Sequence, residues 1–103
     1  MVMNDELNQG DILKIEHIKQ PVLVVSKDFF NKTGEIIGCP VYKTGKPDAL
    51  RIYIHSDDVD GYVHCEKLAL LDLNVRSYSK ICRIHISDIM EITDAIQSIF
   101  DYI

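Results

Sequence analysis

The chain has 103 residues, a formal net charge of −5 at pH 7 and a hydrophobic fraction of 47%. This length suits one domain, residues 1–103, and no apolar run approaches the roughly 20 residues of a membrane-spanning helix. We therefore expect a cytoplasmic protein with no membrane association. The three cysteines, Cys39, Cys65 and Cys82, lack a Cys-x-x-Cys spacing, which argues against a disulfide framework or a zinc cluster.

The first half of the chain predicts three strands. Residues 11–18 alternate between apolar and polar types, and the β-branched run after Pro21 predicts a buried strand. A third strand is expected over residues 36–42. Because Pro40 has no amide donor, we expect this third strand to lie at a sheet edge or to carry a bulge.

A short connector separates the second and third strands. Ser26 or Asp28 can cap a single helical turn over residues 29–31. Thr33 and Gly34 then turn the chain into the third strand.

The second half predicts three more strands, at residues 50–55, 62–71 and 81–86. The first of them alternates strictly, and its outward side is formed by Arg51, Tyr53 and His55. Asp and Gly residues between the first and second of these strands predict a solvated turn over residues 57–61.

A helix is predicted at the C-terminus. Ser87 is a good N-cap, and Asp88 lies near the positive end of the helix dipole. Large apolar residues then recur at helical spacing on one face: Ile89, Ile92, Ile96, Ile99, Phe100 and Ile103. The pattern predicts a mainly β (α+β) fold, a small twisted antiparallel sheet or half-barrel closed by this helix.

Charge is unevenly distributed along the chain. From Lys14 to Arg51 there are seven basic and four acidic residues, so this segment carries +3 and the remainder −8. One side of the molecule can therefore face an anion such as RNA, although the same lysines also suit an ordinary solvated surface.

Several short motifs occur in a characteristic order. They are Gly10-Asp11-Ile12, Pro21-Val22-Leu23-Val24-Val25-Ser26, Phe30-Asn31 ahead of Gly34, and Asp60-Gly61-Tyr62-Val63-His64-Cys65-Glu66 followed by Leu71-Asp72. Together they resemble the MazF/PemK/Kid toxins of type II toxin-antitoxin systems over nearly the whole chain. The resemblance implies an SH3-like small barrel and an mRNA interferase, an endoribonuclease that cleaves single-stranded RNA at specific sequences without a metal or other cofactor. It also implies a homodimer and a cognate antitoxin.

His64 and Glu66 are the predicted catalytic pair. They are two positions apart in a predicted strand, so we expect both side chains on one face, about 7 Å apart. They occupy the positions of the general acid and base of the Kid/PemK branch, where His64 replaces an Arg and Glu66 replaces an Asp. The resemblance implies that Glu66 takes the ribose 2′-OH proton while His64 protonates the departing 5′-oxygen. The products would be a 2′,3′-cyclic phosphate and a 5′-hydroxyl. We expect the carboxylate to raise the pKa of His64 above the usual value of about 6.5.

Five further residues are predicted to assist. His17 can orient the base or share the acid role. Lys19 or Arg51 can stabilise charge on the phosphorane, and Tyr53 and Tyr62 can stack on unpaired bases.

Two positions depart from the MazF branch of the family. The arginine credited there with catalysis is Gln20 here, and the Thr or Ser after the second proline is Tyr42. Gln20 supplies no positive charge, and Lys19 lies one position away. Both Gln20 and Tyr42 are retained as predicted RNA-binding residues.

Two alternatives to a nuclease remain open. These departures also fit a catalytically silent family member that acts as a binding or regulatory module. A DNA gyrase poison similar to CcdB is the other alternative, because the chain ends in an aromatic residue and an isoleucine, Tyr102 and Ile103.

Overall fold

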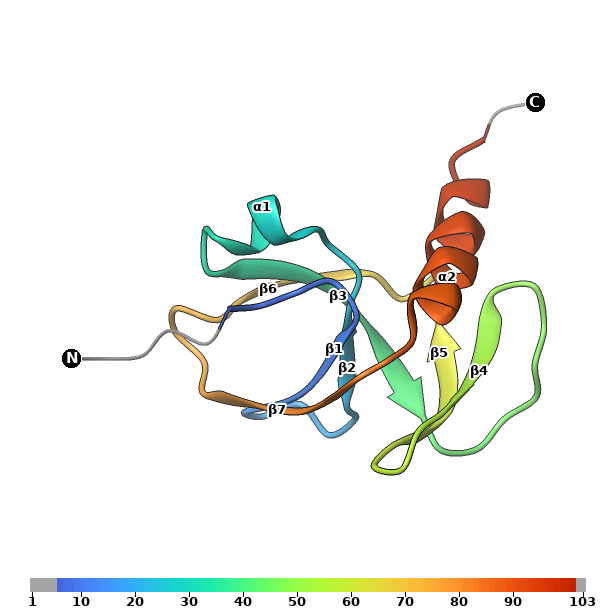
Figure 1. Ribbon diagram of the computed structural model, residues 1–103, viewed down its shortest axis with the longest axis horizontal. Helices are drawn as coiled ribbons and strands as arrows, with labels where there is room; N and C mark the ends of the chain where they lie inside the picture. Colours follow the sequence, from blue (N-terminus) through green and yellow to red (C-terminus); the bar gives the residue numbers. More distant parts are fainter. Residues whose placement is uncertain (1–5, 102–103) are drawn as a thin grey trace.

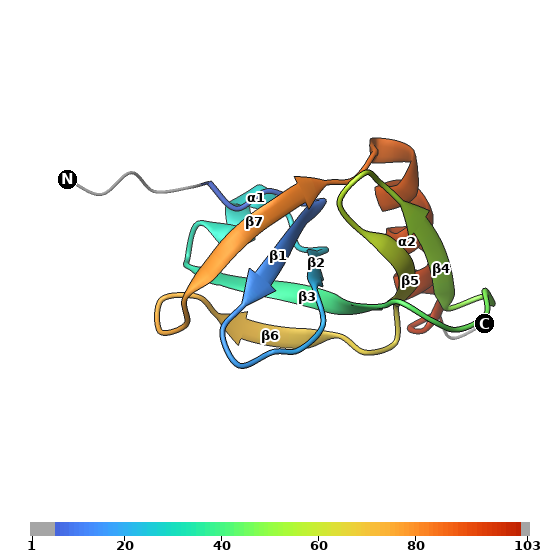
Figure 2. The same ribbon diagram turned by 90° about the horizontal axis from the view of Figure 1, so that it is seen from below.

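The structure is a computed structural model and describes residues 6–101 (Figure 1). The described chain forms β1 (Asp11–Ile15), β2 (Val22–Val24), α1 (Asp28–Asn31), β3 (Glu35–Tyr42), β4 (Arg51–His55), β5 (Asp60–His64), β6 (Ala69–Asp72), β7 (Tyr78–Arg83) and α2 (Ile86–Ser98). The strands make one twisted antiparallel sheet in the order β4-β5-β3-β2-β1-β7, and β6 also pairs with β3 (Figure 2). The predicted mainly β, barrel-like fold with a C-terminal helix is confirmed.

β3 is the central strand of the sheet. β2 pairs with one of its edges, while β6 pairs with Glu35–Gly38 and β5 pairs with Val41 and Tyr42 on the other edge. The Val41 N–H donates to Pro21 O, so the nitrogen of neighbouring Pro40 faces the opposite edge, where the partner changes from β6 to β5. β3 is therefore not an edge strand, and its pairing with β2 through Pro40 has no bulge, so both forms of the prediction are wrong. The proline is tolerated because no strand of the described chain pairs with its nitrogen side between β6 and β5.

The apolar side chains form two cores, one on each side of β1 and β2. The helix-side core comprises Ile12, Leu23, Val25, Cys39, Val41, Ile52, Ile54, Val59, Val63, Cys65, Ile84, Ile89 and Ile92. The barrel core comprises Leu13, Ile15, Val22, Val24, Ile36 and Leu73. Because both faces of β2 are covered, its sequence is continuously apolar rather than alternating.

The predicted strand over 62–71 is two strands in the structure. β5 ends at His64, a turn follows at Cys65 and Glu66, and β6 begins at Ala69. Each piece pairs with a different half of the long strand β3. The strand over 11–18 is also shorter than predicted, because β1 ends at Ile15.

α2 begins two residues earlier than predicted. His85, not Ser87, is its N-cap, and no side chain caps the first turn, although Asp88 lies there as expected. Ile89 and Ile92 are buried, whereas Ile99 and Phe100 are 41% and 68% exposed, so only part of the predicted apolar face is covered. Tyr102 and Ile103 lie outside the described residues.

A buried polar network holds α1 against the sheet. Ser26 does not cap the helix, whose N-cap is Lys27 without a side-chain bond. The Ser26 hydroxyl instead donates to Asn31 Oδ1 at 2.5 Å and accepts from the Ile37 N–H at 2.9 Å. Asn31 Nδ2 donates to the carbonyls of Leu7 and Ser26, both at 3.0 Å. These bonds satisfy polar groups that burial would otherwise leave without partners.

Among residues 6–101, no helix is long and apolar enough to cross a membrane.

Replacing Asn31 should destabilise the fold. Asn31→Ala leaves Ser26 and the two carbonyls without their partner, and we expect a loss of about 1–3 kcal/mol in the free energy of unfolding, measured by urea denaturation. Asn31→Asp keeps the side-chain size but cannot donate, so it should be at least as costly. Asn74→Ala, at an exposed position, is the control. An Asn31→Ala loss no larger than the control loss would contradict the assigned network.

Candidate active site

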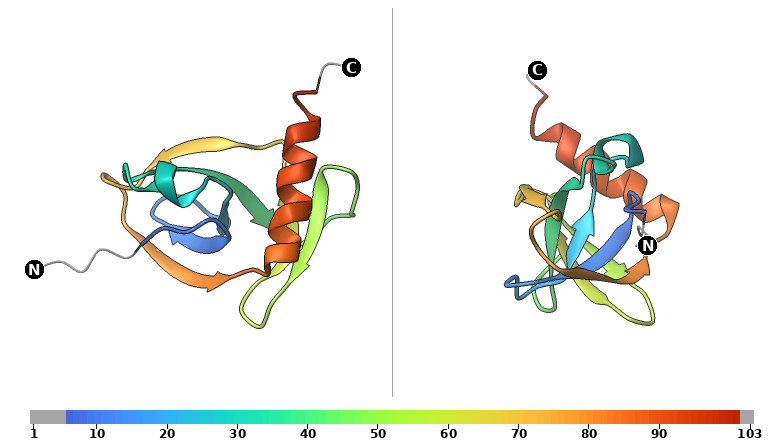
Figure 3. Two further views of the ribbon diagram at one scale, coloured as in Figure 1. Left: turned by 45° about the horizontal axis from the view of Figure 1, so that its top comes forward. Right: turned by 90° about the vertical axis from the view of Figure 1, so that its left-hand side faces the viewer.

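The part of the sheet formed by β3, β5 and β4 has one covered and one open face. α2 lies across the covered face, where Ile52 and Val63 join Ile89 in the helix-side core (Figures 1 and 3). The opposite side, here called the open face, carries polar and aromatic side chains: Tyr42, Arg51, Tyr53, His55, Asp60, Tyr62 and His64. The outward assignment of alternate β4 residues is therefore confirmed.

Arg51 brings the two predicted catalytic residues together. It is paired directly with His64 in the β4 and β5 ladder, and its Nε donates to His64 Nδ1 at 3.4 Å. Its Nη2 donates to Glu66 Oε2 at 2.6 Å. Glu66 lies in the turn after β5, so the expectation that one strand presents both residues is wrong. We call Arg51, His64 and Glu66 the Arg51 cluster.

Asp48 fixes the position of Arg51. Asp48 Oδ2 accepts from Arg51 Nη1 at 3.1 Å, and Asp48 Oδ1 accepts from the backbone N–H groups of Leu50 and Arg51, both at 2.9 Å. The hydrogen bond from the Leu50 backbone, followed by that from the Arg51 side chain, lowers the pKa of Asp48, so its carboxylate is charged at neutral pH. The guanidinium is thus held between two carboxylates and an imidazole.

The pKa of His64 is lowered from 6.5, contrary to expectation. Burial is the largest cause and the charge of Arg51 is the next, and together they outweigh the opposite effect of Glu66. Because Nδ1 accepts a hydrogen bond from Arg51, the neutral ring carries its proton on Nε2. The imidazole is therefore a hydrogen-bond donor at Nε2.

Lys67 is a site residue that the sequence did not indicate. Its Nζ lies 4.7 Å from the centre of the Tyr42 ring and 3.4 Å from the Tyr42 hydroxyl, to which it donates. The Tyr42 ring in turn lies 4.3 Å from that of His64, measured between centroids. The only feature of the sequence that could have indicated Lys67 is its position directly after the predicted catalytic residue Glu66. Lys67 and Arg51 place two positive charges near His64, although Gln20 supplies none.

Tyr53 and Tyr62 form an aromatic pair beside the Arg51 cluster. They face each other across β4 and β5, with ring centroids 5.3 Å apart and a tilt of 54°. Tyr53 is 48% exposed. Gly45 rests against the Tyr62 ring, since a Cβ built there would lie 3.6 Å from it. The loop around Gly45 thus borders the aromatic pair.

His17, Lys19 and Gln20 lie apart from the cluster in the loop between β1 and β2. His17 adopts a φ of 66°, its side chain is 83% exposed, and it pairs with Glu16 at 3.6 Å. Within the described residues, no hydrogen bond or ion pair joins any of the three to the Arg51 cluster. The loop does end close to Tyr42, because Pro21 O accepts from the Val41 N–H.

The thiols take no part in this site. Burial raises the pKa of Cys39 to about 12 and that of Cys65 to about 11, so both stay protonated at neutral pH. Within residues 6–101, no group of three or more His, Cys, Asp or Glu side chains is placed to hold a metal ion.

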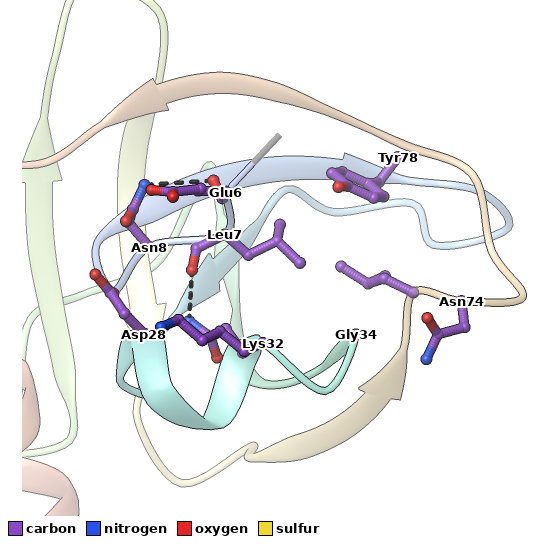
Figure 4. Close-up of a pocket in the computed structure, with 10 residues that line it drawn as sticks. Glu6, Leu7, Asn8, Asp28, Lys32, Gly34, Asn74 and Tyr78 are labelled. Carbon is purple, nitrogen blue, oxygen red and sulfur yellow. Dashed lines mark hydrogen bonds between the residues drawn. The ribbon is translucent and has the colours of Figure 1, made fainter. Parts of the chain in front are cut away.

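A pocket lies beside α1 (Figure 4). α1 is at the other end of the molecule from β4 and β5 (Figure 2). Leu7, Asp28, Lys32 and Tyr78 are among its lining residues. Some of its polar groups already bond within the protein: Asp28 Oδ1 accepts from the Gln9 N–H, and Asn31 Nδ2 donates to the Leu7 carbonyl, both at 3.0 Å. The pocket and the Arg51 cluster do not coincide, and the cluster carries the groups suited to proton transfer.

The charge of Arg51 should be visible in the titration of His64. We expect its NMR titration midpoint below 6.5 in the unmodified protein, and a rise in Arg51→Gln, which removes the second-largest cause of the lowering. Glu66→Gln should lower the midpoint further. Lys19→Gln, in the separate loop, is the control and should leave it unchanged. A midpoint that does not move in Arg51→Gln contradicts the assigned contact.

The chain was compared with known proteins. It matches the family described as PemK-like, MazF-like toxin of type II toxin-antitoxin system over residues 8–100. A MazE-MazF structure from Deinococcus radiodurans is similar with a TM-score of 0.86 at 20% identity, covering 94% of this chain and 98% of that chain. An endoribonuclease from a mycobacterial species gives 0.81 at 16% identity, covering 93% and 92%. The Mycobacterium tuberculosis toxin MazF-mt6 gives 0.66 at 16% identity, covering 81% and 89%. A search of curated proteins found no significant match.

The solved structures share less than 25% identity with the chain, so they show a common fold. The family match covers almost the whole chain, including every strand, α1 and α2. This chain is therefore a member of the PemK-like, MazF-like toxin family of type II toxin-antitoxin systems.

Proposed function

We propose that this toxin is an endoribonuclease that cleaves single-stranded RNA on the open face, without a metal ion. The observation that carries the proposal is the Arg51 side chain, which joins an imidazole and a carboxylate at 3.4 and 2.6 Å. An acid, a base and a cation in one solvent-accessible cluster are the groups that phosphodiester cleavage by an internal 2′-hydroxyl requires.

In the proposed reaction, Glu66 accepts the proton of the ribose 2′-OH. The 2′-oxygen forms a bond to phosphorus, the bond from phosphorus to the 5′-oxygen breaks, and His64 donates a proton from Nε2 to that oxygen. Arg51 and Lys67 stabilise the charge on the phosphorane. The products are a 2′,3′-cyclic phosphate and a 5′-hydroxyl, and DNA is inert because it lacks the nucleophile.

The lowered pKa of His64 fits this role once substrate is bound. In the free protein, the charge of Arg51 disfavours the imidazolium. A phosphate beside Arg51 adds a negative charge and competes for the guanidinium, and both effects favour protonation of His64. The acid is therefore charged when the scissile phosphate is in place.

The remaining predicted residues act at the margins of the site in this proposal. Tyr53 and Tyr62 stack on a base, and Tyr42 supports the His64 ring. His17, Lys19 and Gln20 contact the RNA strand where it passes the loop between β1 and β2.

We also propose a homodimer and a cognate antitoxin as partners, and a cytoplasmic location. The Deinococcus radiodurans structure contains MazE with MazF, and a mycobacterial endoribonuclease was solved with its cognate antitoxin. In this chain, α2 and the two residues that follow it expose large apolar side chains that would suit a second copy: Ile86, Met90, Ile99 and Phe100.

The nuclease proposal predicts cleavage of mixed RNA in the presence of EDTA, with 2′,3′-cyclic phosphate ends. His64→Ala and Glu66→Gln should each reduce the rate by about 10²–10⁴-fold, because each removes one proton-transfer group. Glu35→Gln makes the same chemical change on the far half of β3 and is the control. End-group analysis of the RNA fragments provides the readout.

Other results would select the alternatives. RNA that stays intact at high protein concentration would overturn the nuclease proposal and favour a silent module. Gyrase-linked DNA breaks that disappear when Tyr102 and Ile103 are deleted would favour a gyrase poison instead.

The dimer proposal predicts a mass of two chains by light scattering. A double variant, Ile86→Asp with Met90→Asp, should shift the protein toward monomer, because it places charges on the apolar side chains of α2. Ser79→Asp adds a charge at an exposed position on β7, outside α2, and should leave the mass unchanged. A monomeric unmodified protein at high concentration would refute the homodimer.

A further inference from the structure

A second pair of histidine and carboxylate lies on the open face. His55 Nδ1 is 2.6 Å from Asp60 Oδ1, and the two residues face each other across β4 and β5. We call them the His55 pair. The proposed reaction makes no use of it.

The His55 pair is in line with the Arg51 cluster. Three successive outward pairs follow the two strands: Arg51 with His64, then Tyr53 with Tyr62, then His55 with Asp60. Outward residues repeat about every 7 Å along a strand, so the aromatic pair lies between two polar pairs. A single RNA strand that enters the Arg51 cluster and stacks a base on the tyrosines therefore has its next base at the His55 pair.

The charge at this end suits a base rather than a phosphate. From His55 to Tyr62 the chain has three aspartates and no Lys or Arg. The lysines and the arginine lie instead around the other end, at Arg51, Lys67 and the loop beside Tyr62. A phosphate would be repelled from the aspartates, whereas a neutral base with hydrogen-bond donors would be attracted.

The His55 pair also leaves a suitable acceptor. Asp60 Oδ1 is engaged by His55, while no hydrogen bond of the described residues uses Asp60 Oδ2. A carboxylate oxygen accepts hydrogen bonds only. It therefore favours a base with an exocyclic amino group, as in adenine, cytosine or guanine, over uracil, whose two carbonyl oxygens flank its single N–H.

We infer that the His55 pair is a specificity site for the RNA substrate. Asp60 reads the base next to the one stacked on Tyr53 and Tyr62, and His55 holds the carboxylate in place. The inference rests on the proposed function, because it takes single-stranded RNA as the ligand of the open face.

The test uses short RNAs in which every 2′-hydroxyl is replaced by a 2′-O-methyl group, so that binding is measured without cleavage. Each base is replaced in turn by uracil, and binding is followed by fluorescence anisotropy. We expect one position at which uracil weakens binding about tenfold, the loss of one hydrogen bond to a charged group. Asp60→Ala should abolish this difference, and His55→Ala should reduce it.

Asp58→Ala is the matched control, because it removes the same charge two residues before Asp60, in the connection between β4 and β5. It should change the affinity for all RNAs alike and keep the discrimination against uracil. If Asp60→Ala also keeps the discrimination against uracil, as expected for Asp58→Ala, the inference is overturned.

The outcome is separable from that of the proposed function. Cleavage by the unmodified protein with no effect of Asp60→Ala on base preference would refute the specificity site alone. Base-dependent binding without cleavage would refute the nuclease and retain the site. Absence of RNA binding would refute both.

Discussion

The Arg51 guanidinium is the interaction on which the candidate site depends. It reaches from β4 to His64 on β5 and to Glu66 in the following turn. Asp48, three residues before Arg51, accepts a hydrogen bond from the same guanidinium. His64 and Glu66 are close because they are two residues apart, and the contacts with Arg51 fix how the two side chains are oriented relative to each other. The same contact orients the His64 ring and contributes to its lowered pKa, so it sets both the geometry and the electrostatics of the site.

Three polar residues of the family motifs, Asp11, Ser26 and Asn31, stabilise the fold and are not part of the candidate site. Asp11 is 2% exposed and pairs with Lys80 and Arg83 of β7, which ties the first strand to the last. Ser26 and Asn31 hold α1 against β3. These buried polar contacts need particular residues at particular places, because an unpaired partner would be costly. They build the framework that presents the open face, and none of them touches the Arg51 cluster.

The positive charge of the site comes from positions that differ from those of the MazF branch. Gln20 precedes the strand proline, yet Arg51 and Lys67 approach His64 from β4 and from the turn after β5. Tyr42 fills the space between Lys67 and His64. The positive charges near His64 thus come from residues that are close to it in the fold, and not from the position before Pro21. Because the fold gathers Arg51 and Lys67 near His64, the net charge of −5 says little about the local electrostatic field at the open face.

The sequence alone determined the mainly β class, the C-terminal helix, the family and the outward side of β4, because alternation, helical spacing and motif order are local properties. It could not determine that the run over 62–71 divides, that Pro40 lies at a change of partner, or that Arg51 joins His64 to Glu66. It also gave the wrong direction for the pKa of His64. These features depend on pairing between distant segments, on burial and on charges from other strands, which only the tertiary structure decides.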